Sequence, residues 1–76
     1  MDPYQNLANA IIILAVKDYK VALKRYKKFP DDVDNIRSVE ELEKFFLSEW
    51  FQFLSNLDGE QLMLDVERMV LGKAVA

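Results

Sequence analysis

The side chains that perform most acid–base, metal and thiol chemistry are missing from this 76-residue chain. It contains no His and no Cys, so it lacks the commonest metal ligand, the usual general base near neutral pH and any thiolate. Ser38, Ser48 and Ser55 therefore have no histidine to activate them. No glycine-rich phosphate-binding loop occurs either. We predict a non-enzymatic protein with no catalytic site, no metal and no cofactor.

The remaining candidates for chemistry are carboxylates. The run Asp31-Asp32-Val33-Asp34 has the acidity of a calcium loop but lacks the glycine that an EF-hand needs for its sharp turn. We interpret residues 30–37 as a solvated acidic linker. Asp18 and Glu43 lie at the edges of predicted apolar helix faces, and we expect them to form ion pairs at the rim of the core. The expected partners are Arg25, Lys44 and Arg68.

Lysines recur at helical spacing in the first third of the chain. They form a lysine ridge of Lys17, Lys20, Lys24, Lys27 and Lys28. Such a stripe can follow phosphates. However, the ridge holds no Arg for bidentate base recognition, and the whole chain has a net charge of −3. We therefore rank nucleic-acid binding below an acidic protein partner or a simply solvated face.

Three helix starts predict the elements that carry these residues. In a capping box, a side-chain acceptor at the N-cap is followed three residues later by Glu or Gln. The pattern occurs at Asp2–Gln5, Ser38–Glu41 and Asp58–Gln61. Pro30 ends the first helix, and Gly72 caps the last. The chain is thus predicted to be all-α: a single-domain three-helix bundle with helices at about 3–28, 39–55 and 59–71 and a frayed tail at 73–76.

Apolar spacing predicts the core. The first helix has one broad apolar face from Tyr4 to Tyr26, and the last has a stripe from Leu62 to Val70. In the middle helix Phe46 and Trp50 are one turn apart, and we expect both to anchor the core. That helix is expected to be continuous, or else kinked or split near Ser48, where a fresh turn can start.

Four apolar residues do not fit these stripes: Ile13, Phe45, Leu47 and Phe51. One interpretation makes them a partner-binding surface, since a cluster of exposed apolar side chains marks an interface. The partner is then a host protein or a second copy of the chain in a homodimer. In the other interpretation, a kink at Ser48 turns Phe45 or Phe51 inward.

Three segments together resemble a known group of proteins: residues 15–19 (AVKDY), 43–51 (EKFFLSEWF) and 57–62 (LDGEQL). The chain resembles short uncharacterised proteins encoded by phages, prophages and conjugative elements of Gram-positive bacteria. The resemblance implies a mobile-element setting in a bacterial cell, and it implies no activity and no site residues. An apolar run of only seven residues, the missing secretory leader and the missing cysteines favour the cytoplasm and no membrane span.

Overall fold

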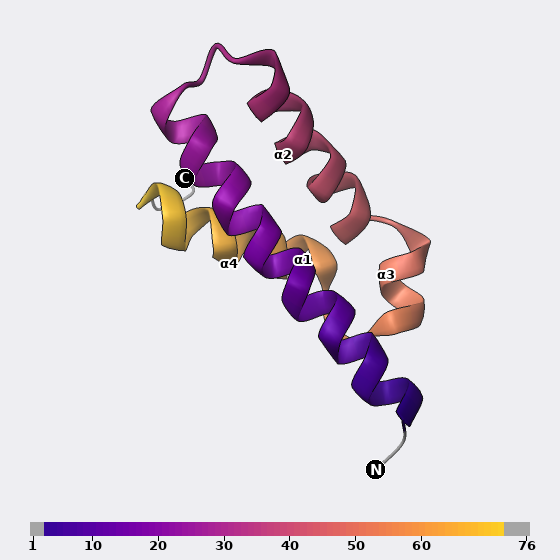
Figure 1. Ribbon diagram of the computed structural model, residues 1–76. Helices are drawn as coiled ribbons and strands as arrows, with labels where there is room; N and C mark the ends of the chain where they lie inside the picture. The colour runs from indigo at the N-terminus through magenta and orange to yellow at the C-terminus, as the bar shows by residue number, and fades with distance from the viewer. Residues whose placement is uncertain (1–2, 73–76) are drawn as a thin grey trace.

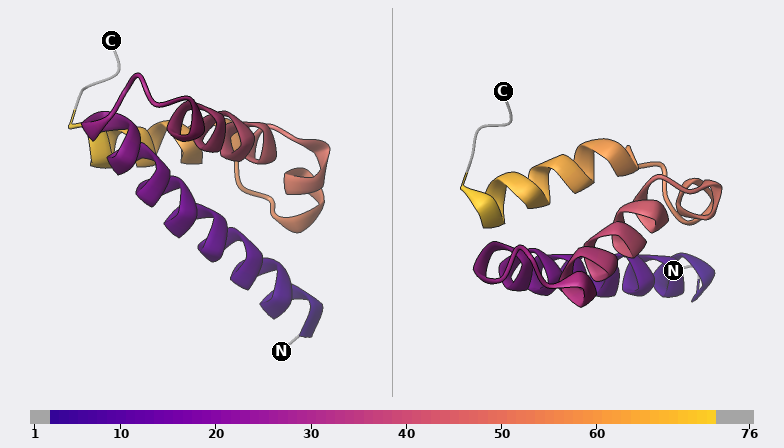
Figure 2. Two further views of the ribbon diagram at one scale, coloured as in Figure 1. Left: turned by 45° about the horizontal axis from the view of Figure 1, so that its top comes forward. Right: turned by 90° about the horizontal axis from the view of Figure 1, so that it is seen from above.

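The computed structural model describes residues 3–72, and this part of the chain contains four helices and no strand. They are α1 (Pro3–Lys28), α2 (Val33–Phe46), α3 (Glu49–Leu54) and α4 (Gly59–Leu71). The all-helical class is confirmed. The long α1 forms the spine; α2 runs back alongside it, and α4 crosses it on another side (Figures 1 and 2).

The ranges of α1 and α4 are those expected from the sequence, but the middle of the chain differs. Where one helix over 39–55 was expected, either continuous or kinked or split near Ser48, α2 starts six residues earlier and ends at Phe46, and the separate helix α3 follows. The cap of the first predicted box, at Asp2, and the tail 73–76 lie outside the described residues.

The expected acidic linker is largely helical because Asp32 caps α2. The Asp32 carboxylate accepts a hydrogen bond from the Asp34 backbone N–H at 2.9 Å, and acidic groups at this end favour the helix through its dipole. The Asn35 side chain also donates to the carbonyl oxygens of Arg25 and Phe29, both at 3.3 Å, which satisfies groups at the end of α1. Ser38, the predicted cap, instead lies inside α2 and donates to the Asp34 carbonyl.

The break between α2 and α3 is held by Ser48. Its hydroxyl donates to the Phe45 carbonyl oxygen at 2.6 Å and accepts from the Phe51 N–H at 3.3 Å, so one side chain links the end of α2 to the start of α3. The Leu47 N–H bonds to Glu43 and the Ser48 N–H bonds to Phe45, which closes the last turn of α2. The chain therefore re-enters a helix with a different face toward the core.

The expected pairing of Phe46 and Trp50 in the core is consequently wrong. Phe46 is buried, but Phe51 takes the second inward position with 0% of its surface exposed, whereas Trp50 is 59% exposed. Phe51 packs in an aromatic cluster with Phe45, Phe46 and Tyr19, with ring centroids 5.4 to 5.8 Å apart along the cluster. Tilted and edge-on ring pairs at this spacing are favourable.

The start of α4 closes the core below this cluster. Asp58 caps α4 as expected, accepting from the N–H groups of Glu60 and Gln61 at 3.0 and 3.2 Å. Gly59 is buried, and a Cβ there would collide with the Phe46 carbonyl group. At the other end Gly72 adopts the expected left-handed conformation, with φ of 67°.

The burial pattern predicts opposite effects for two neighbouring aromatic residues. Phe51→Ala should lower the free energy of unfolding by about 3–5 kcal/mol, because it empties a fully enclosed site. Trp50→Ala should change it by less than about 1 kcal/mol, as for other surface substitutions. Urea denaturation followed by circular dichroism measures both, and Phe51→Leu gives a milder core variant if Phe51→Ala does not fold. A larger loss for Trp50→Ala than for Phe51→Leu would show that the inward residue has been misassigned.

Candidate functional site

The most exposed aromatic side chains of the described chain lie together on α3. Trp50 and Phe53 are three residues apart, so they share the outer face of this short helix, and Phe53 is 84% exposed. Leu47 and Leu57, in the connections before and after α3, are also more than half exposed, and they line a hollow with Gln52 that neither Trp50 nor Phe53 lines. We call Trp50 and Phe53 the α3 face.

The charged residues of the segment that contains α3 have one sign. Glu49 lines a hollow with Phe53, Asp58 and Glu60 are exposed after α3, and no Lys or Arg occurs from residue 45 to residue 67. A Trp on a rigid helix offers a large contact area at a small cost in side-chain entropy, and Trp is enriched among residues that dominate binding energy. The chemistry of this surface suits a partner with an apolar patch and basic side chains at its rim.

The structure separates the four residues that the sequence suggested for partner binding. Ile13 and Leu47 are exposed, as a binding role requires, but they lie on different parts of the molecule, α1 and the α2–α3 turn. Phe45 is half-buried against the core, and Phe51 is fully buried. For Phe51 the structure agrees with the second interpretation, in which the chain at Ser48 turns this side chain inward, and a buried Phe51 cannot belong to a binding surface.

The lysine ridge lies on the side of α1 away from the core. Lys17, Lys24, Lys27 and Lys28 are exposed and Lys20 is half-buried, whereas the buried residues of α1 lie on the opposite side. The Lys28 ammonium sits 5.8 Å from the centre of the Phe29 ring, which is also exposed. The ridge is therefore accessible to a partner along the outer side of α1.

A second candidate site is a cleft between α1, α2 and α4 with a volume of about 280 Å³. Leu23, Val39 and Leu71 contribute apolar walls, and Glu43 and Glu67 line the same cleft. The buried Tyr19 hydroxyl donates to Glu67 Oε1 at 2.7 Å. Glu67 thus links α4 to α1 through this buried phenol, and Glu43 of α2 lines the same cleft.

The electrostatics of this cleft raise two pKa values. Burial raises the pKa of Tyr19, and its hydrogen bond to Glu67 acts in the same direction. Burial also raises the pKa of Glu43 above its ordinary value of 4.5, and the negative charge of Glu67 adds to the effect. The ion pair expected for Glu43 is not found among the described residues; Glu43 faces another carboxylate instead, because α4 brings Glu67 to this point.

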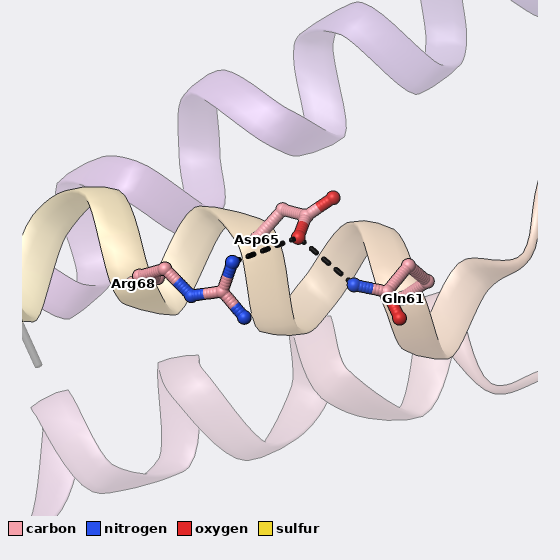
Figure 3. A network of polar contacts seen from close by, with 3 residues as sticks. All are labelled: Gln61, Asp65 and Arg68. Carbon is pink, nitrogen blue, oxygen red and sulfur yellow. Dashed lines mark hydrogen bonds and ion pairs between the residues drawn. The ribbon is translucent and has the colours of Figure 1, made fainter. Parts of the chain in front are cut away.

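Other polar groups support the helices without forming a site. Figure 3 shows Asp65 on α4 accepting a hydrogen bond from Gln61 Nε2 at 2.9 Å, with Arg68 Nη1 at 3.9 Å from the same oxygen. This is the one ion pair between residues that the structure describes, and it is exposed, so it contributes little. The pairing expected for Asp18 is likewise not found there.

Metal and membrane roles gain no support from the described residues. No group of three His, Cys, Asp or Glu side chains within residues 3–72 is arranged to hold a metal ion. In that part of the chain no helix combines the length and apolarity that crossing a membrane requires.

Comparison with models of known protein families, with curated proteins and with solved structures finds no match. Sequence reasoning missed Trp50 and Phe53 as surface residues, although the capping hydroxyl of Ser48 was the signal that could have shown them. It also missed the Tyr19–Glu67 bond, which only the crossing of α4 creates.

Because Glu43 and Glu67 lie together in the cleft between α1, α2 and α4, we predict that Glu43→Gln stabilises the fold at neutral pH. A carboxyl group whose pKa is raised in the folded state holds more protons there than in the unfolded chain. Its effect on stability is therefore most favourable below pH 4.5 and is lost as the pH rises through the raised pKa. Urea denaturation at several pH values should show Glu43→Gln more stable than the parent at pH 7, with the gain disappearing in acid. Glu41→Gln, at an exposed position of α2, is the matched control; an equal gain there would show a general charge effect.

Proposed function

We propose that this chain is a non-enzymatic accessory protein of a phage or other mobile element that acts in a bacterial cytoplasm by binding a host protein. The observation that carries the proposal is the α3 face. The single Trp of the chain and a neighbouring Phe are held on the surface by a helix whose other side is anchored in the core by Phe51.

The way in which α3 is attached to the rest of the fold supports a binding role for its exposed side chains. The helix has only six residues, so it cannot be stable alone; Ser48 and Phe51 fix it to the rest of the fold. One aromatic side chain of this short helix attaches it to the core, and two more are exposed. The exposed pair therefore forms an apolar surface that exists before any partner binds. Pre-formed surfaces lose less conformational entropy on binding.

The mobile-element setting comes from the resemblance of residues 15–19, 43–51 and 57–62 to short proteins of phages, prophages and conjugative elements. The most specific of these segments, EKFFLSEWF, contains the break at Ser48 and both anchors of α3. The segment therefore has a physical role in displaying the α3 face, whatever partner binds it.

Nucleic-acid binding through the lysine ridge is the second candidate. The exposed position of Lys17, Lys24, Lys27 and Lys28 favours it. The acidic groups around α3 and the net charge of −3 oppose it, because phosphate-binding proteins depend on a positive field. We therefore place a protein partner first.

Affinity capture with surface variants tests the proposal. Trp50→Ser combined with Phe53→Ser should abolish capture of a defined host protein from a Gram-positive lysate, with at least a tenfold loss of affinity when the purified pair is measured by calorimetry. Met69→Ser, at an exposed apolar position of α4, is the matched control and should keep full affinity. Circular dichroism checks that both variants are folded. A partner that binds the double variant as tightly as the parent would contradict the proposal.

A further inference from the structure

A second apolar surface lies on α1, on the side of the helix opposite its buried residues. Leu7, Ala10, Leu14, Lys17 and Val21 are all exposed, and they follow one another at alternating spacings of three and four residues. We call this row the outer seam. Alternating spacing of this kind is the pattern by which one helix packs along another at a shallow angle.

The first half of α1 has the composition of a covered surface rather than a solvated one. Residues 3–16 contain no charged side chain, although Leu7, Ile13 and Leu14 are each more than half exposed. Depletion of charge is typical of the centre of an interface. The first turns of α1 also extend past α2 and α4 (Figure 2), so those helices leave this part of the seam open.

We propose that the outer seam binds the same seam of a second copy of the chain, with the two α1 helices antiparallel. The distribution of charge along α1 favours the antiparallel direction. An antiparallel pair places the uncharged half of each α1 against the basic half of the other, which starts at Lys17. A parallel pair would align the two lysine ridges and make like charges neighbours.

The geometry of the seam fits a two-fold axis at Leu14. Leu7 and Val21 lie seven residues on either side of it, or about 10 Å along the helix. In the antiparallel pair each Leu7 therefore reaches the partner's Val21. Beside Val21 the surface has a hollow of about 320 Å³ between α1 and α2, with Ala22 and Leu42 as its other apolar walls and with Asp18, Arg25, Asn35 and Ser38 as its polar lining. The incoming Leu7 side chain can contact its apolar walls, at the edge beside Val21.

The two-fold arrangement also limits the size of the assembly. The same row of residues meets itself, so the association stops at a dimer instead of growing into a filament. Small Ala10 allows the helix backbones to approach, and Lys17 can lay its apolar stem along the seam while its ammonium stays in water. A seam of this length belongs to the smaller, reversible class of interfaces.

Cysteine cross-linking of the full chain tests both the dimer and its direction. The chain has no cysteine of its own, so a single substitution at an exposed position gives an unambiguous product. Under mild oxidation, Leu14→Cys should form a disulfide-linked dimer much faster than Met69→Cys on α4. A mixture of Leu7→Cys with Val21→Cys should give a mixed dimer faster than either variant alone.

Sedimentation equilibrium provides the second readout. The parent should show a reversible monomer–dimer equilibrium into the high micromolar range, and Leu14→Glu should shift it to monomer by placing two carboxylates at the axis. A parent that stays monomeric throughout, or Leu7→Cys that cross-links to itself faster than the mixed pair forms, would overturn the proposal. The double variant Trp50→Ser, Phe53→Ser should dimerise like the parent, so failure of the dimer and failure of the α3 face are separate results.

Discussion

The turn at Leu47 and Ser48 fixes which side chains of α3 face the core, and the exposed surface of α3 follows from that choice. Had α2 continued, Trp50 would lie one turn after Phe46 and point inward. The Ser48 hydroxyl instead bonds to both helices, donating to the Phe45 carbonyl and accepting from the Phe51 N–H. Phe51 then fills the core and Trp50 faces water.

Contacts in the core hold Phe51 in its inward position. Phe51 contacts the rings of Phe45 and Phe46, and Gly59 lets the start of α4 approach the Phe46 carbonyl, where a larger residue would collide. A small all-helical domain without disulfides has little stability to spare. The fold therefore depends on Phe51, the fully buried aromatic residue that attaches α3. The same attachment leaves the other side of α3 exposed.

The sequence predicted the helical class and the long first helix because these depend on local signals. Pro30 and Gly72 end helices through backbone geometry alone, and Asp58 caps α4 through hydrogen bonds two and three residues away. The acidic run at 31–34 was misinterpreted as a linker because the same carboxylates that suit a solvated loop also suit a helix N-terminus.

The candidate sites were less predictable, since they depend on helix phase and on contacts between distant residues. The spacing of four residues between Phe46 and Trp50 predicted that Trp50 is buried. The two residues Leu47 and Ser48 interrupt the helix between them, and this interruption is enough to turn Trp50 toward the solvent. The Tyr19–Glu67 bond spans 48 positions in the sequence, and no local pattern indicates it. Ile13 and Leu47 were identified as leftover apolar residues, but which surface each belongs to required the packing of all four helices.

The fluorescence of Trp50 tests its outward position most directly, because the chain has only one Trp. In the folded protein the emission maximum should be close to that of the chain unfolded in urea. Acrylamide, a neutral quencher, should reduce the emission with a constant at least half of the unfolded value. A strongly blue-shifted emission that acrylamide barely quenches would place Trp50 in the core and contradict the account.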